Sequence, residues 1–207
     1  MRRVPYPVAI ITATDPHGPT EKAYRGMTVS SFSTVTLNPE PVLSFNVKRP
    51  SETLSALLSS GRFLVHLLAP AKETAALARD FAKGNHNLSI LSGHGDFGFV
   101  AHGPTEVDGD RNNNDSRPLP LLRRRNTDGV MVGQEHVDFP FVFECRLHPH
   151  QMEVHDHTIV LGHIVDTILQ RPLDGDAQGQ KAGSAKELCL TYADTRFWEM
   201  GHEIKNQ

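Results

Sequence analysis

Three short segments near the start of the chain place the strongest constraint on its fold. VAIITAT (8–14) is rich in β-branched residues, MTVSSFSTVTL (27–37) alternates with a period of two, and VLSFNV (42–47) follows after an NPEP turn. A period of two is the spacing of side chains on one face of a strand. Because short turns containing proline or glycine join neighbouring strands, these segments predict an antiparallel sheet or barrel.

Later segments add two short helices and more strands to this pattern. A helix is expected over 52–59, with Ser51 as its N-cap and Gly61 after its end. Another is expected over 71–83, where apolar residues recur at helical spacing. Further strands are expected at 62–68, 139–147, 158–169 and 187–193. The predicted fold class is therefore mainly β (α+β), an antiparallel barrel of six to seven strands with short helices.

Two polar segments interrupt the regular pattern. Residues 84–128 are rich in Gly, Asn, Asp, His and Pro, and we expect a long polar excursion over the surface with at most short elements. Residues 170–186 form a second polar stretch that predicts a loop. A length of 207 residues suits one domain, so residues 1–207 are expected to form a single domain.

Composition excludes several classes of protein. The net charge of −3 supplies no basic field for nucleic acid or an anionic membrane, and Arg123–Arg125 fits a solvated loop. No apolar run approaches the roughly 20 residues of a membrane helix. The two cysteines, Cys145 and Cys189, form no CxxC pair, which favours reduced thiols. We expect a cytoplasmic protein without nucleic-acid or membrane partners; import into an organelle stays open if a longer N-terminus precedes Met1.

Hydroxyl side chains are unusually dense at the start of segment 27–37. Five of them fall within eight positions after Met27: Thr28, Ser30, Ser31, Ser33 and Thr34. Hydroxyls can donate to phosphate oxygens without leaving a charge behind. Threonine is also a good strand former on a solvated face. Both interpretations stay open from these residues alone.

A second polar group precedes the helix expected over 52–59. Lys48 and Arg49 stand directly before its N-terminus, and Ser51 and Thr53 lie in its first turn. Free N–H groups and the positive end of the helix dipole make such a terminus an anion site. A capped helix with two surface cations is the simpler alternative. The proximity of the hydroxyl strand favours a cradle for a phosphorylated cofactor.

Four histidines gather in the segment HPHQMEVHDH, at His148, His150, His155 and His157. A metal-dependent hydrolase of the H-x-H-x-D-H type would need histidines at positions 152 and 154, which are Met152 and Val154. No metal ligand is therefore assigned. His157, at the start of a strand, is expected either to reach a ligand or to lie on the surface.

The order of these motifs resembles the flavin reductase-like family, whose fold is the FMN-binding split barrel. The resemblance rests on PYPVAIITA, on the run from GMTVSSF through RPSET to residue 83, and on DHTIVLGHIVD, and it returns at about 188–198. It implies a homodimer with FMN at the subunit interface. By resemblance, Thr28, Val29, Ser30, Ser31 and Phe32 line the flavin, Lys48, Arg49, Ser51 and Thr53 hold its phosphate side, Phe81 and Ala82 approach the ring, and His157 lies on the nicotinamide side as the catalytic residue.

The sequence departs from the family pattern at three places. His155 stands where the family usually has glycine, no helix precedes the first strand, and the 84–128 excursion is longer than in compact bacterial members. These departures resemble a fungal-type or otherwise divergent member.

The resemblance implies an NAD(P)H:FMN oxidoreductase that passes hydride from nicotinamide to FMN, with a monooxygenase as a recipient of reduced flavin. The choice between NADH and NADPH stays open. Two alternatives remain: a flavin-binding carrier or sensor without fast turnover, and a metal-dependent hydrolase that uses the histidines.

Overall fold

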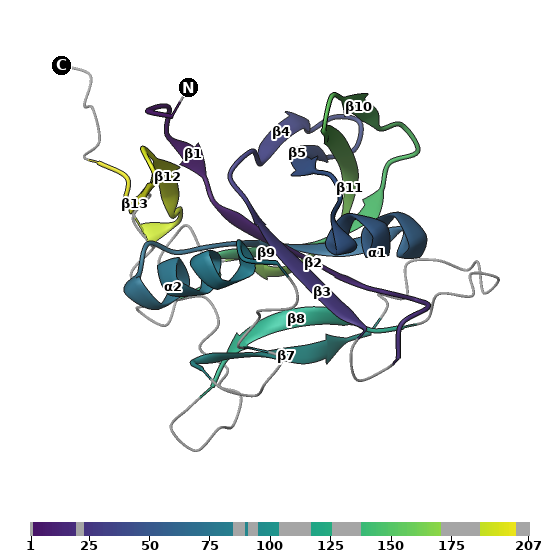
Figure 1. Cartoon of the computed structure of the whole chain (residues 1–207), viewed down its shortest axis with the longest axis horizontal. Coiled ribbons are helices and arrows are strands. Elements are labelled where there is room, and N and C mark those ends of the chain that lie inside the picture. Colours follow the sequence, from purple (N-terminus) through teal and green to yellow (C-terminus); the bar gives the residue numbers. More distant parts are fainter. Residues whose placement is uncertain are drawn as a thin grey trace.

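The computed structural model describes residues 2–19, 23–84, 90, 95–103, 117–125, 138–170 and 187–201. In these residues the strands form three antiparallel sheets, and two helices pack against the largest (Figure 1).

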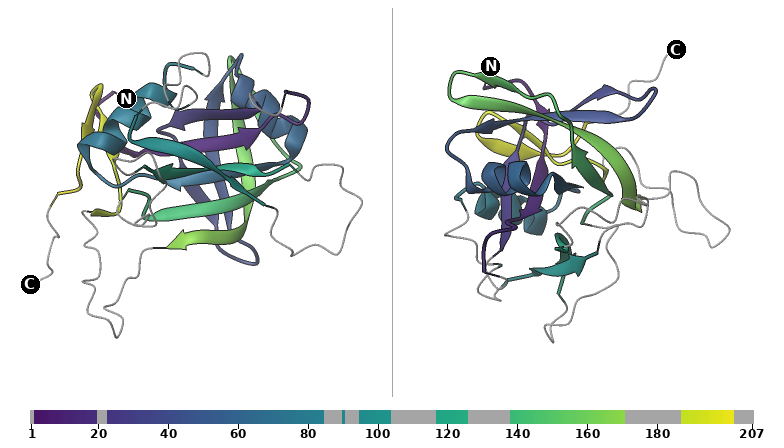
Figure 2. Two further views of the ribbon diagram at one scale, coloured as in Figure 1. Left: turned by 90° about the horizontal axis from the view of Figure 1, so that it is seen from below. Right: turned by 90° about the vertical axis from the view of Figure 1, so that its right-hand side faces the viewer.

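The largest sheet has eight strands and curls around an apolar interior (Figure 2). Its strands are β2 (Ala9–Thr14), β3 (Tyr24–Val29), β4 (Ser33–Thr36), β5 (Val42–Lys48), β6 (Arg62–Leu67), β9 (Phe141–Leu147), β10 (Met152–Val154) and β11 (His157–Gln170). The order is β3-β2-β6-β9-β11-β5-β4, and β10 pairs with β11. This arrangement confirms the predicted mainly β, antiparallel split barrel, whose edges are β3 and β4.

The segment 27–37, expected as one strand, is two strands that lie at opposite edges of the sheet. β3 ends at Val29 and pairs with β2, whereas β4 begins at Ser33 and pairs with β5. Between them, the Ser31 hydroxyl accepts a hydrogen bond from the Asn46 N–H at 2.8 Å. Serine hydroxyls offer the backbone an alternative to ladder pairing, so the chain crosses from one edge to the other here.

The two helices begin and end close to where the sequence predicts. In α1 (Glu52–Ser60), the Ser51 hydroxyl accepts from the Leu54 N–H at 3.2 Å, and Gly61 closes the helix with φ of 68°. In α2 (Lys72–Phe81), the Thr74 hydroxyl accepts from the Ala71 N–H at 3.1 Å. The helix expected over 71–83 therefore ends at Phe81.

Apolar side chains form two cores on the two faces of the curled sheet. The inner core combines barrel residues such as Phe45 and Phe63 with Leu54 and Leu57 of α1. A side chain at Gly162 would collide with the ring of Phe63, so close packing inside the barrel requires glycine there. The outer core lies between the sheet, α2 and the remaining strands.

A ribbon of two strands covers this outer core and corrects the expectation of a surface excursion over 84–128. β7 (Phe97–His102) and β8 (Leu119–Arg124) pair with each other, and most of the apolar side chains of β8 are buried. Burial of these apolar residues stabilises the ribbon against the barrel. The rest of that segment (85–89, 91–94, 104–116 and 126–128) lies outside the described residues.

Side-chain hydrogen bonds hold β8 against the barrel wall. The hydroxyls of Thr12 and Thr14 donate to the carbonyls of Pro120 and Pro118 at 2.7 and 2.6 Å. Fully buried His66 accepts the Leu122 N–H through Nε2 at 3.1 Å. These bonds occupy backbone groups of β8 that have no strand partner on that side.

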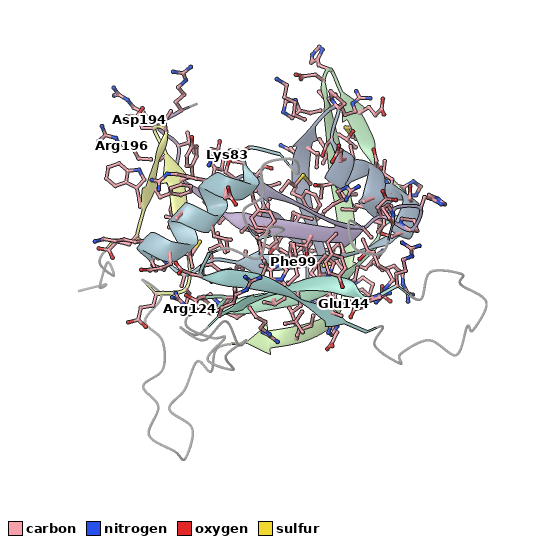
Figure 3. The ribbon with its side chains drawn as sticks, turned by 60° about the horizontal axis from the view of Figure 1, so that its bottom comes forward. Lys83, Phe99, Arg124, Glu144, Asp194 and Arg196 are labelled. Carbon is pink, nitrogen blue, oxygen red and sulfur yellow. The ribbon has the colours of Figure 1, made fainter. Side chains whose placement is uncertain are left out.

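Ion pairs fasten the two ends of the ribbon (Figure 3). At one end, buried Glu144 accepts from Arg62 at 2.7 Å and lies 2.9 Å from His102 Nε2. At the other end, Arg124 donates to the buried Asp138 carboxylate at 2.7 Å. Charges removed from water require such partners.

A third, small sheet joins the two ends of the described chain: β1 (Tyr6–Pro7), β12 (Thr191–Ala193) and β13 (Arg196–Trp198). The strand expected over 187–193 is thus shorter, and most of the 170–186 loop falls outside the described residues. Within the described chain, neither helix has the length and apolar character needed to cross a membrane.

Candidate functional site

A cleft of about 350 Å³ opens between β3, an edge strand of the curled sheet, and the end of β5. Strand β3 forms one wall, β5 forms the opposite wall, the first turn of α1 closes one end, and the last turn of α2 contributes Phe81. Its volume falls in the range of small-molecule sites.

Seven of the twelve residues proposed from the sequence line this cleft: Thr28, Val29, Lys48, Ser51, Thr53, Phe81 and Ala82. The other five, Ser30, Ser31, Phe32, Arg49 and His157, are not among its lining residues. Residues that the sequence did not single out also line it: Gly26, Met27, Asn46, Val47, Pro50, Glu52 and Gly84.

The aromatic ring of Phe81 rests directly on β3. A Cβ atom at Gly26 would collide with the edge of that ring, so this position must be glycine for the helix to lie so close. Phe99 of β7 packs edge-on against Phe81 with ring centroids 6.1 Å apart, and Tyr24 packs on Phe99 at 5.5 Å (Figure 3). The ribbon β7–β8 therefore supports one wall of the cleft.

Two of the conspicuous hydroxyls already serve the fold. Thr28 donates to the Ala78 carbonyl at 2.7 Å and so ties β3 to α2. Ser31 accepts from the Asn46 N–H. A hydroxyl that has given its proton to a carbonyl keeps acceptor lone pairs. Thr28 can therefore accept an N–H group from a ligand more readily than it can donate to a phosphate.

Groups that can bind an anion lie at the end of the cleft formed by α1. The helix N-terminus presents its N–H groups there, and Lys48 stands at the rim with 73% of its side chain exposed. Glu52 also lines the cleft, but Arg25 lies 3.6 Å from its carboxylate. The Ser51 O–H is directed at the Met27 sulfur at 3.9 Å, a weak acceptor that an anionic oxygen would replace.

Arg49 lies outside this cleft. Its guanidinium pairs with Glu153 at 2.8 Å and donates to the His155 carbonyl at 2.6 Å. It lines a neighbouring hollow of about 520 Å³ with Pro50, Ser51, Leu54, Ser55, Leu58 and Asp156. The alternation of side chains explains the placement: Lys48 and Arg49 are consecutive and leave the end of β5 in different directions.

His157 lies on the strand beside the cleft rather than in it. It stands opposite Lys48 in the β11–β5 register, and its Nδ1 lies 2.7 Å from Asp156 Oδ1. The hydrogen bond from His157, together with the nearby Lys48 ammonium at 3.8 Å, lowers the pKa of the Asp156 carboxyl. Lys48, Asp156 and His157 thus form a charged group at the rim.

His155, in the turn between β10 and β11, has a backbone φ of 51°. This left-handed conformation favours glycine, which accounts for glycine in the family pattern at this turn.

The other histidines of the cluster lie at a distance from the cleft. The His148 ring stacks on His163 with centroids 4.8 Å apart and lies 5.3 Å from His150. Among the described residues, no group of three or more His, Cys, Asp or Glu side chains is arranged to hold a metal ion.

Phe32 contributes to a different hollow, the apolar mouth, at the other end of the barrel. This hollow has a volume of about 360 Å³, and its apolar lining comprises Phe32, Leu37, Pro41, Val42, Leu43, Leu67, Phe141, Phe143 and Ile164. Leu37 keeps 68% of its surface exposed beside it.

A split barrel with a small-molecule cleft at its seam is the architecture of a flavin-binding reductase, and comparison with known proteins agrees. The family model described as "Flavin reductase like domain" matches residues 1–200. The chain therefore belongs to this family, as the sequence predicted.

Individual relatives carry related names. The NADH:FMN oxidoreductase of Rhodococcus qingshengii is 35% identical over 83 residues, and the match spans 40% of this chain and only 39% of that protein. The NADH:FAD oxidoreductase SgcE6 of Streptomyces globisporus C-1027 superposes with a TM-score of 0.60 at 20% identity, covering 99% of this chain and 86% of that one. A homolog of nitrilotriacetate monooxygenase component B from Mycobacterium thermoresistibile gives 0.61 at 17% identity, with the same coverage. At these identities the two structures establish the shared fold.

Proposed function

We propose that the protein is an NAD(P)H-dependent flavin reductase that binds FMN in the cleft between β3, β5 and α1. The observation that carries the proposal is the convergence of an aromatic wall at Phe81 with an anion-binding end at Ser51 and Lys48. The family and the Rhodococcus relative's name support the same activity. When bound, flavin and nicotinamide supply the hydride chemistry.

The residues of the cleft suit this ligand by their chemistry. Phe81 and Val29, both almost fully buried, form an apolar backing to the cleft where a ring system would lie, and Thr28 keeps lone pairs to accept a ring N–H. At the other end, the N–H groups of α1, the Ser51 hydroxyl and the Lys48 ammonium hold a phosphate. Lys48 places a positive charge, and His157 places an imidazole ring, at the open rim, where a nicotinamide would enter.

Oxidation of the nicotinamide tests this function directly. Purified protein with added FMN should consume NADH or NADPH, followed at 340 nm, and should bind FMN more tightly than riboflavin because the α1 end of the cleft attracts an anion. Flavin binding without turnover would instead identify a carrier or sensor. Failure to bind any flavin would contradict the assignment of the cleft.

We also propose a homodimer in which a second copy of the chain covers the apolar mouth, with Phe32 in the subunit interface. The mouth shares no residue with the cleft, so this interface differs from the one at the flavin that the resemblance implies. The apolar lining and the exposed Leu37 and Val35 beside it would leave a monomer with apolar surface in water. Light scattering should give a dimer mass, and Leu37→Lys should shift it toward the monomer. A wild-type monomer at micromolar concentration would contradict this interface.

A monooxygenase component is the proposed recipient of reduced flavin. The support is the name of the mycobacterial structure, which is one component of such an enzyme. Transfer should appear as substrate oxidation when the two proteins are mixed with NAD(P)H and flavin.

A further inference from the structure

The hollow beside α1 shares two residues with the flavin cleft. Pro50 and Ser51 line both cavities, so the two meet at the N-terminus of α1. The second hollow, here called the α1 hollow, is bounded by the outer side of α1 and by the turn between β10 and β11, which lies beside that helix (Figure 1). A ligand that fills the cleft can therefore continue around the helix terminus.

The α1 hollow has an apolar floor. Leu54 and Leu58 lie one helical turn apart and Pro50 adjoins them. Leu58 keeps 44% of its surface exposed. It is the one apolar residue among the exposed positions of α1, since the others are Glu52, Ser55 and Ser59. A flat, weakly polar ring such as a purine can cover this floor and remove it from water.

The rim of the α1 hollow is charged, with opposite signs at two places. Glu153 and the His155 carbonyl fix the Arg49 guanidinium, yet its Nε is buried and finds no acceptor among the described residues. A buried N–H without a partner is unfavourable, and an anionic oxygen brought within reach by a small side-chain rotation would supply one. Asp156, whose pKa is lowered chiefly by the hydrogen bond from His157, stays ionised and can accept from sugar hydroxyls.

We propose that the α1 hollow binds the adenosine 5′-phosphate half of a dinucleotide whose other half occupies the cleft. The purine covers Leu54 and Leu58, the phosphates pass the N-terminus of α1 beside Arg49, and the ribose hydroxyls face Asp156. The inference rests on the proposed flavin site. Two dinucleotides carry this group, FAD and NAD(P)H, so the site either favours FAD over FMN or holds the far half of the nicotinamide cofactor.

The variant Leu58→Asp tests the proposal, because it removes part of the apolar floor and places a negative charge where the purine must lie. Ser59→Asp is the matched control: it adds the same charge at the next position of the same helix turn, and Ser59 does not line the hollow. Affinities for FMN and FAD are measured by quenching of flavin fluorescence, and KM for NADH is measured with saturating FMN.

If FAD supplies the group, Leu58→Asp lowers the ratio of FAD to FMN affinity at least tenfold and leaves KM for NADH as in the control. If the nicotinamide cofactor supplies it, KM for NADH rises at least fivefold while the flavin ratio stays as in the control. Ser55→Asp, on the rim of the same hollow, should act in the same direction, which guards against misfolding of Leu58→Asp. Normal FMN reduction with neither change in either variant overturns the nucleotide site but leaves the reductase standing. Absence of flavin binding in the wild type overturns both.

Discussion

At the scale of single residues, the rim group of Lys48, Asp156 and His157 borders the opening through which we expect the nicotinamide to enter the cleft. Asp156 receives the hydrogen bond of His157 and lies 3.8 Å from Lys48. Since the side chain of His157 is 45% exposed, we expect its ion pair with Asp156 to contribute little to folding, and a ligand contact is the role proposed for it.

Replacing His157 with alanine should reduce hydride transfer more than flavin affinity. Loss of a nicotinamide contact lowers kcat/KM for NAD(P)H by tenfold for about each 1.4 kcal/mol, while the melting temperature stays nearly unchanged. Stopped-flow reduction of bound FMN and a thermal scan measure the two effects. An early melting transition with a normal rate per folded molecule would mean that His157 only supports the β10–β11 turn.

His155→Gly should be tolerated and should stabilise the turn slightly. The left-handed conformation at φ of 51° costs a non-glycine residue about 1 kcal/mol, partly offset by the greater freedom of glycine in the unfolded chain. Urea unfolding should show a gain between about 0 and 1 kcal/mol. A clear loss of stability would show that the imidazole itself contributes to the turn.

At the scale of elements, the ribbon β7–β8 links a remote part of the sequence to the cleft. Phe99 is not among the residues that line the cleft. Its ring packs on the ring of Phe81, which does line the cleft. We therefore expect a change in the ribbon to alter flavin affinity through the contact between Phe99 and Phe81.

Phe99→Ala should weaken FMN binding by several-fold in addition to destabilising the protein by about 2–4 kcal/mol. Without the edge-on ring behind it, Phe81 gains freedom that flavin binding must remove. Val100→Ala on the same strand is the control, because it removes apolar volume from β7 at a residue outside the Tyr24–Phe99–Phe81 stack. Calorimetric titration with FMN compares them, and equal affinities for the two variants would contradict the link.

The helices and most barrel strands could be predicted because their signals are local. Ser51 and Gly61 mark both ends of α1, β5 alternates apolar and polar residues from Leu43 onward, and β6 contains a short apolar run. The sequence did not predict the ribbon because its two short strands lie within a segment dominated by Gly, Asn and Asp, Pro118 and Pro120 interrupt the second one, and their apolar residues find a core only in the folded molecule. The break at residues 30–32 was missed because the alternation of side chains continues through it.

The candidate site was predictable where residues share a strand face or a helix turn. Asn46 lies two residues before Lys48 and could have been found by the same alternation. Gly26 gave a weaker signal, an isolated glycine in a strand pattern. Arg49 is separated from Lys48 because its guanidinium binds Glu153 and the His155 carbonyl of the β10–β11 hairpin. These partners are distant in the sequence, so no local rule predicts them.

At the scale of the whole molecule, one buried imidazole joins the barrel to the ribbon and makes the free energy of unfolding depend on pH. His66 sits between the Ile10 carbonyl and the Leu122 N–H and is fully buried. Burial lowers its pKa from 6.5 to about 3, because the charged form has no access to water.

Stability should therefore fall as the pH drops below 6.5. Between pH 6.5 and about 3 the unfolded chain binds a proton at this histidine that the folded protein excludes, so the contribution is complete above 6.5 and is lost on acidification. The slope from this group approaches about 1.4 kcal/mol per pH unit. The free energy of unfolding, measured with urea at pH 7.5 and at pH 5, should differ less for His66→Gln than for the wild type. Equal differences for the two proteins would contradict the role of His66 in the pH dependence.

The open seam of the barrel has a consequence for how freely its sequence can vary. β3 is the last strand of the sheet order, so its outer edge presents main-chain N–H and C=O groups to the cleft. A ligand can pair with this edge in the way that an additional strand would. It is then recognised by main-chain N–H and C=O groups, which every residue type except proline carries. Exchanges on β3 outside Gly26 and Thr28 should then leave ligand recognition intact as long as the strand keeps its place.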